Sequence, residues 1–108
     1  MLKIKKDQQV EIDVFDGVKR CTLACGKDVL MAKFTYNKGA KVPPHKHSYE
    51  QVTTILKGKQ KITIKMNGKK EEFTVETGES YIVPASFEHE QESIQRVLLL
   101  IPGVLLPN

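Results

Sequence analysis

Residues 39–58 read GAKVPPHKHSYEQVTTILKG, and this stretch decides how the chain is expected to fold. His45 and His47 are two positions apart, so both rings point to one face of an extended chain. Gln51 is four positions further on and can return to the same face after the backbone bends. The prolines at 43 and 44 fix φ before the pair, which lowers the entropy lost when the rings are held around an ion. The stretch therefore predicts three convergent side chains of the metal-ligand type.

A second stretch, GESYIVPASFEHE at residues 78–90, supplies His89, the last of the three histidines in the chain. Imidazole is a good ligand for zinc, nickel, copper or iron, and the amide oxygen of Gln51 adds a neutral oxygen donor. His45, His47, Gln51 and His89 are thus the candidate ligands of one divalent ion, with positions left for water or a substrate. The alternative is that the histidines are hydrogen-bonded core residues of a barrel that holds no metal.

The spacing of the first stretch resembles that of the cupin superfamily, whose first motif runs Gly, five residues, His-x-His, three or four residues, Glu, six residues, Gly. Gly39, His45, His47, Gln51 and Gly58 match this spacing, with glutamine in the glutamate position, as in many small single-domain cupins. A His-x-His pair alone is a weak signal, and the complete spacing makes the resemblance specific.

The second cupin motif runs Gly, five residues, Pro-x-Gly, two residues, His, three residues, Asn. Gly78, Pro84 and His89 match it, while Ser86 and Ser93 stand in the Gly and Asn positions. The resemblance spans about residues 28–101 and implies one cupin domain over residues 1–108. It implies an all-β double-stranded β-helix, the cupin jelly-roll barrel, with a metal inside one open end where a small ligand enters.

The alternation of apolar and polar residues agrees with an all-β chain and shows no convincing helix. Asn67-Gly68 and Asp16-Gly17 are strong hairpin signals between alternating runs. Many short antiparallel strands with short connections predict a sandwich or a closed barrel. The expected strands are residues 10–15, 18–25, 28–36, 50–57, 59–67, 70–76, 80–83, 87–92 and 94–101.

Composition excludes several classes of protein. The 108 residues include 40% hydrophobic ones, enough for one core, and 17 basic against 13 acidic side chains leave a net charge of +4. Arg20 and Arg96 are the only arginines and there is no tryptophan, which argues against nucleic-acid binding. No apolar run reaches the ~18 residues of a membrane span and the first residues do not resemble a signal peptide, so a cytoplasmic protein is expected.

The two cysteines are not expected to form a disulfide. Cys21 and Cys25 lie on one predicted strand, about 13 Å apart, beyond the reach of a disulfide. Such cysteines are usually small core residues, and the alternative is that they bind a metal.

The last predicted strand carries five consecutive apolar residues, Val97 to Ile101, with no polar face. One interpretation buries both faces within a single barrel. The preferred one is a homodimer in which this strand and Val104, Leu105 and Leu106 meet a second subunit.

Within the superfamily, the chain resembles small cupins of the pectin-degradation type, which linearise 4,5-unsaturated monouronates. Three imidazoles and an amide are neutral, so a bound ion keeps its double charge and attracts a carboxylate or enediol oxygen. The metal would be zinc, nickel, manganese or iron, and the ligand a carboxylate or sugar derivative. An isomerase, lyase or dioxygenase acting on a small oxygenated metabolite such as a sugar acid is one hypothesis, and a non-catalytic ligand-binding or sensor cupin is the other. A structural assembly protein is a third, weaker class.

The last strand argues against the uronate activity itself. Aligned with the uronate enzymes, it places Leu100 where they carry an inward carboxylate and Pro102 where they carry an aromatic residue. Arg96 is a candidate for binding a substrate carboxylate, or else an exposed edge residue. Glu50 is expected to face away from the site by strand alternation. Tyr36, Tyr49 and Tyr81 are expected to be packing residues.

Overall fold

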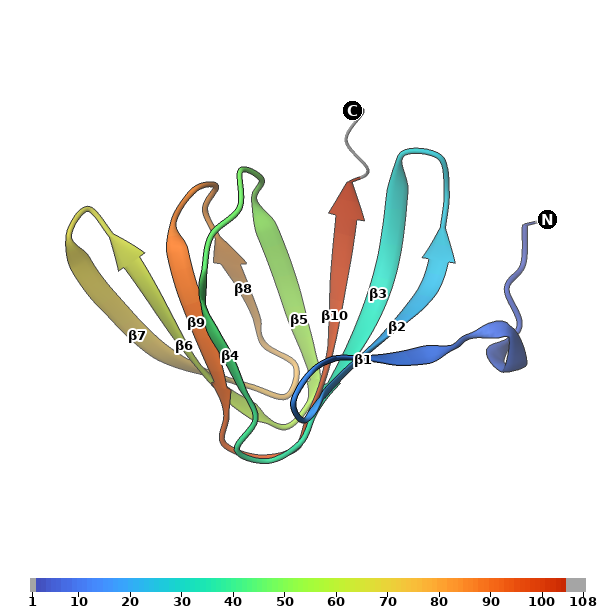
Figure 1. The fold of residues 1–108 in the computed structure, drawn as a ribbon, viewed down its shortest axis with the longest axis horizontal. Helices are drawn as coiled ribbons and strands as arrows, with labels where there is room; N and C mark the ends of the chain where they lie inside the picture. The colour runs from blue at the N-terminus through green and yellow to red at the C-terminus, as the bar shows by residue number, and fades with distance from the viewer. Residues whose placement is uncertain (1, 105–108) are drawn as a thin grey trace.

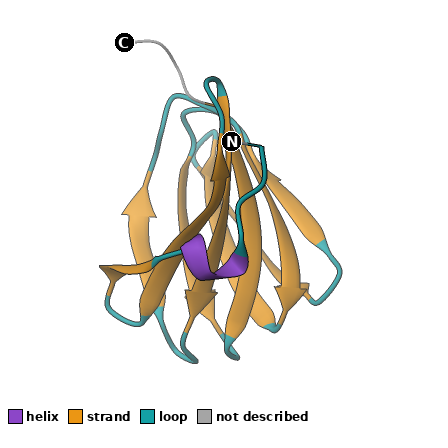
Figure 2. Cartoon of the chain, turned by 90° about the vertical axis from the view of Figure 1, so that its right-hand side faces the viewer, coloured by secondary structure: helices purple, strands orange, loops and turns teal. Residues whose placement is uncertain are grey.

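The computed structural model describes residues 2–104, and within them the chain forms ten β-strands and one 3-10 turn at Lys6–Gln8 (Figure 2). No helix in this part of the chain has the length and apolar character needed to cross a membrane. The predicted all-β class is confirmed. The strands are β1 (Glu11–Phe15), β2 (Val18–Cys25), β3 (Val29–Tyr36), β4 (Lys41–His45), β5 (Gln51–Lys57), β6 (Lys59–Met66), β7 (Lys69–Glu76), β8 (Ser80–Val83), β9 (Glu88–Ser93) and β10 (Val97–Val104).

The strands form two antiparallel sheets that face each other. One has six strands in the order β1-β2-β3-β10-β5-β8, and the other has four in the order β4-β9-β6-β7. The sheets converge at the lower end in Figure 1 and diverge toward the upper end, where the β4–β5 loop and the end of β10 lie. This arrangement is the predicted jelly roll, or double-stranded β-helix.

Alternating side chains on the facing surfaces of the two sheets build the core. On β5, Gln51, Thr53 and Ile55 are buried while the residues between them are exposed. Ile62 on β6, Val83 on β8 and Leu99 on β10 are fully buried. Burial of an apolar side chain of this size stabilises the folded state by about 1.5–3 kcal/mol. Because successive side chains of a strand point to opposite faces, the face that carries the apolar residues turns inward.

β4 is a strand that the sequence pattern did not predict. Its residues read KVPPH, and two consecutive prolines normally exclude a central strand because they donate no ladder hydrogen bonds. β4 lies at the edge of its sheet and pairs only with β9, and its register shifts between Val42 and His45 across the prolines. The strand tolerates the prolines because no partner on its other side requires their missing N–H groups.

β10 begins and ends three residues later than predicted, at Val97–Val104 instead of 94–101. Val97 and Leu99 face the core and are fully buried, whereas Leu98 and Leu100 are half-buried on the outer face of the six-stranded sheet. The apolar run is therefore divided between two faces by the strand's alternation. The side chain of Val104, together with Leu105 and Leu106, lies outside the described residues.

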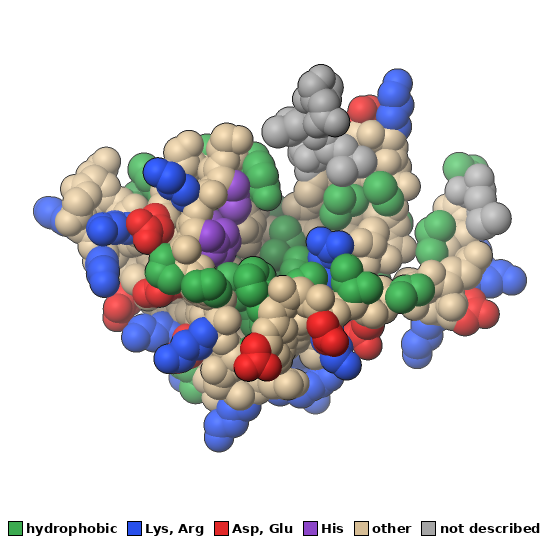
Figure 3. Space-filling view, in the orientation of Figure 1, with side chains coloured by type: hydrophobic (Ala, Val, Ile, Leu, Met, Phe, Trp, Pro, Cys, Tyr) green, Lys and Arg blue, Asp and Glu red, His purple; other side chains and the backbone are tan. Residues whose placement is uncertain are grey.

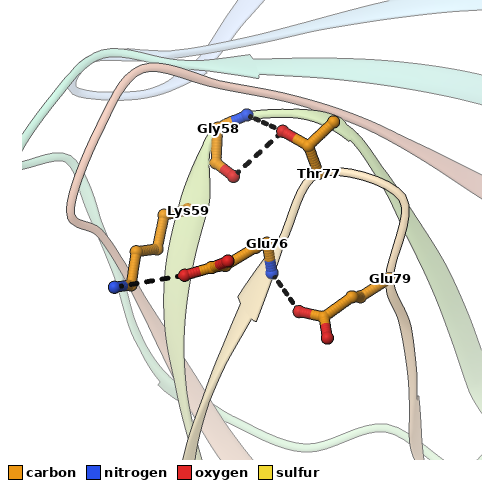
Figure 4. A network of polar contacts seen from close by, with 5 residues as sticks. All are labelled: Gly58, Lys59, Glu76, Thr77 and Glu79. Atoms are coloured by element: carbon orange, nitrogen blue, oxygen red, sulfur yellow. Dashed lines mark hydrogen bonds and ion pairs between the residues drawn. The ribbon is translucent and has the colours of Figure 1, made fainter.

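The turns at the lower end are tied closely to one another (Figure 4). The Gly58 N–H donates to Thr77 Oγ1 at 3.0 Å, and Lys59 Nζ lies 3.3 Å from Glu76 Oε1. Gly58 has φ +109°, and a Cβ at this position would overlap the carbonyl oxygen of Arg96. Only glycine fits there, which gives the second glycine of the first motif a structural role.

Candidate metal centre

The three histidines meet at the upper end, between the two sheets. His45 ends β4 and is paired in register with His89 on β9, while His47 lies in the loop that leads to β5. Ligand atoms of all three lie within 4.8 Å of one another. Histidine side chains line a hollow between the two halves of the molecule in Figure 3. Strand pairing thus joins residues that are 44 positions apart in the sequence.

Each imidazole is oriented by a backbone carbonyl two residues away. The Nδ1 atoms of His45, His47 and His89 lie 3.0, 2.8 and 3.1 Å from the carbonyl oxygens of Pro43, Tyr49 and Phe87. A carbonyl oxygen only accepts, so Nδ1 carries the proton and donates. In the neutral ring this leaves Nε2 as a free lone pair, the form in which histidine binds a metal.

Two observations indicate that these lone pairs fit a cation. The Nε2 atom of His89 is buried without a hydrogen-bond partner, which is costly for a polar atom. The Nε2 atom of His47 lies 3.2 Å from Gln51 Oε1, although both atoms are acceptors in this arrangement. Ligand atoms about 2.0–2.1 Å from a tetrahedral ion are roughly 3.3 Å from one another, so the separation is that of two neighbours in a metal shell.

Thr53 sets the orientation of the Gln51 amide. Gln51 Nε2 donates to Thr53 Oγ1 at 3.0 Å, which turns Oε1 toward His47. Thr53 in turn contacts Tyr81, whose hydroxyl accepts a 2.8 Å hydrogen bond from Gln91. A buried polar chain therefore supports the one candidate ligand that is not a histidine.

Burial sets the protonation state of His89 and Tyr81. Burial lowers the pKa of His89, and the neighbouring His45 and His47 lower it further, against a hydrogen bond to the Phe87 carbonyl that raises it. Burial raises the pKa of Tyr81 to about 12, while its hydrogen bonds to Thr53 and Gln91 oppose the shift. Near neutral pH, His89 is thus a neutral imidazole and Tyr81 a neutral phenol.

A cavity of about 640 Å³ opens beside the histidines. His45, His47 and Gln51 line it together with Tyr36, Tyr49, Gln91 and Arg20. The remaining lining residues form what we call the apolar wall: Val14, Phe15, Val18, Leu30, Ala32, Phe34, Val42, Ile101, Pro102 and Gly103. This lining contains no aspartate, glutamate or lysine from the described residues, and its one cation is Arg20.

The predicted position of the last strand's inward residue was wrong. Leu100 does not line the cavity, whereas Ile101 does and packs against the core. The reason is strand parity: Leu99 is fully buried and its neighbours must face the other way. An apolar side chain, Ile101, therefore occupies the inward position.

The other candidates divide between the cavity and the surface. Glu50 is exposed and outside the cavity lining, as expected from strand alternation. Tyr36 and Tyr81 are core residues, while Tyr49 is exposed and stacks on His47 with ring centroids 4.1 Å apart. Arg96 lies at the lower end beside Gly58 and does not reach the cavity. Both cysteines are free, as predicted, and neither belongs to the histidine cluster.

Sequence reasoning missed Arg20 and Thr53. Thr53 could have been found from its position two residues after Gln51, which places both side chains on one face. The strand pattern around Arg20 gives no sign that its side chain turns inward, because β2 alternates polar and apolar residues only loosely.

Comparison with known proteins agrees with this geometry. A family model described as "Cupin domain" matches residues 32–96, which include all four candidate ligands. A search among curated proteins gave no match.

Several solved structures share the fold. An RmlC-like cupin from Shewanella frigidimarina has a TM-score of 0.82 at 20% identity, covering 100% of this chain and 94% of that one. KdgF from Halomonas sp. has a TM-score of 0.78 at 18% identity, with 96% and 93% covered. The polyketide cyclase RemF from Streptomyces resistomycificus has a TM-score of 0.80 at 18% identity, with 96% and 79% covered. Family match, topology and histidine cluster agree, and the chain belongs to the cupin domain family.

Proposed function

We propose that this cupin binds one divalent metal ion through His45, His47, Gln51 and His89, and holds a small carboxylate-bearing metabolite beside it. The observation that carries the proposal is the buried, unpartnered Nε2 atom of His89, which faces the other histidines. Zinc, nickel, manganese and iron all accept nitrogen and neutral oxygen donors of this kind. The bound ion would act as a Lewis acid that polarises a ligand oxygen.

The cavity favours ligand binding over proton-transfer catalysis. General acid–base groups typically contribute 10²- to 10⁴-fold to a rate, and the described lining offers no carboxylate or lysine for that role. Burial also raises the pKa of Tyr36, so its phenol keeps its proton and donates it to Gln91 Oε1 at 2.9 Å. A binding or sensor protein is therefore the function that the site supports best.

The resemblance of the sequence to pectin-degradation cupins, together with the structural likeness to KdgF, supports a second candidate, a metal-assisted isomerase or lyase acting on a sugar acid. Turnover of an unsaturated uronate by the parent protein and by an Ile101→Asp variant separates the two. Binding without turnover in the parent supports the sensor, and efficient turnover supports the isomerase. A metal-dependent dioxygenase is the third candidate, and consumption of O₂ by the iron-loaded protein tests it.

Elemental analysis of purified protein tests the metal site. We expect about one divalent ion per chain in the parent and a large loss in His47→Ala and in His89→Ala. The exposed Lys46→Ala variant is the matched control, because it changes the same loop without removing a ligand. Unchanged metal content in both histidine variants would contradict the proposal.

We further propose that residues 1–108 form one cupin domain that associates as a homodimer through the outer face of the six-stranded sheet. Leu98 and Leu100 on β10, Val52 on β5 and Ile82 on β8 supply apolar surface on this face. Light scattering should give the mass of two subunits for the parent and one for Leu100→Glu, while Lys65→Glu on the other sheet should not change the mass. A parent that stays monomeric at high concentration would refute the dimer.

A further inference from the structure

We propose that the cavity binds an elongated acid with an apolar body, and that Arg20 holds a second acidic group at a distance from the histidine cluster. The inference rests on the proposed function, because the ligand's first acidic group is the one expected beside the metal. It adds a second anchoring point and a specificity for the part of the ligand between the two.

Arg20 is directed into the cavity by the pairing of its strand. It is in register with Phe34 on β3, and paired residues project from the same face of a sheet. Phe34 belongs to the apolar wall, and Arg20 lines the same cavity. The ion pairs found within residues 2–104 join lysines to glutamates, and none of them involves Arg20. Its guanidinium is therefore available for an anion, which it can bind bidentately.

The sheet order separates Arg20 from the histidine cluster. Two strands, β3 and β10, lie between β2, which carries Arg20, and β5, which carries Gln51. Three steps between strands correspond to roughly 14 Å across the sheet. Gln51 is also displaced from Arg20 along the strand direction. Across the sheet, Arg20 is in register with Phe34, Phe34 with Leu99, and Leu99 with Ile55. Gln51 lies four residues from Ile55 along β5. A ligand that reaches both ends must therefore be longer than a single small acid.

The apolar wall selects the body of such a ligand. Hydroxyl groups placed against aliphatic and aromatic side chains lose their hydrogen bonds to water and gain none in return. A methylene chain or an aromatic ring suits the same surface. The cavity volume of about 640 Å³ is in the ordinary range for small-molecule sites. The lining thus favours an apolar diacid over a polyhydroxylated sugar acid of the same length.

Calorimetric titration with simple acids tests the inference on the zinc-loaded protein. The probes are the straight-chain dicarboxylates from adipate to sebacate, the monocarboxylates of equal carbon number, and galactarate, the tetrahydroxylated counterpart of adipate. We expect the best dicarboxylate to bind at least about tenfold more tightly than its matched monocarboxylate, and adipate to bind more tightly than galactarate, which has the same length. Galactarate binding as tightly as adipate would overturn the claim of an apolar body.

Variants of the two arginines test the role of Arg20. Arg20→Met should abolish the tenfold advantage of the dicarboxylate, and Arg20→Lys should retain only part of it, because an ammonium lacks the bidentate fork. Arg96→Met is the matched control, since Arg96 is the other arginine and lies outside the cavity. Zinc content and thermal unfolding of each variant show that it is folded and metal-loaded. An advantage that survives in folded Arg20→Met, or disappears equally in Arg96→Met, would overturn the role of Arg20.

The metal-free protein separates failure of this inference from failure of the proposed function. After EDTA treatment, a dicarboxylate can use only Arg20, so its advantage over the monocarboxylate should disappear, while Arg20→Met should still weaken binding of both acids. A parent that takes up no zinc refutes the metal proposal alone. In that case, equal affinity of the metal-free parent and Arg20→Met for octanoate would refute the Arg20 site independently.

Discussion

The lower and upper ends of the barrel differ in how their polar groups are hydrogen-bonded. At the lower end, turns from distant parts of the chain bond to one another through their backbones: Thr77 N–H to the Gly58 carbonyl at 3.1 Å, and Ile94 N–H to the Lys59 carbonyl at 3.0 Å. At the upper end, His89 Nε2 remains without a partner inside the protein. The comparison shows that backbone hydrogen bonds between turns hold the closed end together, while the open end brings three imidazoles together and leaves the Nε2 atom of His89 without a partner.

The loops of the upper end are nevertheless held in place. Ser86 adopts φ 68°, the left-handed conformation in which the second cupin motif has glycine. Its N–H donates to the His47 carbonyl at 2.7 Å, which ties the β8–β9 loop to the loop that carries His47. The serine therefore accepts a strained backbone angle while it preserves the contact that positions a candidate ligand.

The largest effect is expected from breaking the closed end. Gly58→Ala adds a Cβ that overlaps the Arg96 carbonyl at φ +109°, and it should destabilise the protein by at least about 3 kcal/mol. The control is Gly68→Ala, where φ is +80° but nothing lies within 4 Å of the added Cβ, so a loss of about 1–2 kcal/mol is expected. Urea unfolding measures both, and equal losses would show that the contact with Arg96 does not matter.

An intermediate effect is expected from loosening the open end. Thr53→Val removes the acceptor of the Gln51 amide, so Oε1 is no longer held toward His47, and zinc affinity should fall about 10- to 100-fold. Thr54→Val is the matched control, because Thr54 bonds to Ser80 on the exposed side of the same strand. Competition with a chromophoric chelator measures the affinity. An equal loss of zinc affinity in Thr54→Val would show that the effect comes from disturbing β5 and not from the hydrogen bond to Gln51.

The smallest effect concerns the pH dependence of the metal-free protein. The pKa of His89 is lowered from 6.5 in the folded state, so the unfolded chain binds a proton more readily. The free energy of unfolding should therefore decrease as pH falls below about 6.5, and this loss is complete below the lowered pKa of the folded state. Urea unfolding between pH 7.5 and 5 measures it. His89→Gln should show a smaller slope, and an unchanged slope would assign the dependence to other groups.

The alternation of residues was sufficient to predict nine of the ten strands, with ends that differ by up to three residues. The spacing of His45, His47, Gln51 and His89 was sufficient to predict that they meet. The first prediction succeeds because a period of two is a local property of an extended chain. The second depends on the resemblance to the two cupin motifs, because His89 is 44 positions from His45 and joins it only through the pairing of β4 with β9. Elemental analysis and the Thr53 variant remain the tests of whether these four residues bind a metal.

Tertiary structure alone decided what depends on neighbours distant in the sequence. The prolines of β4 are compatible with a strand only because that strand is an edge, which the sheet order determines. The inward residue near the end of β10 is Ile101 and not Leu100, because a uniformly apolar run carries no information about parity until it pairs with β3 and β5. Arg20 enters the cavity for the same reason: a polar residue on a loosely alternating strand acquires its direction from its partner Phe34 and from the six-stranded sheet around it.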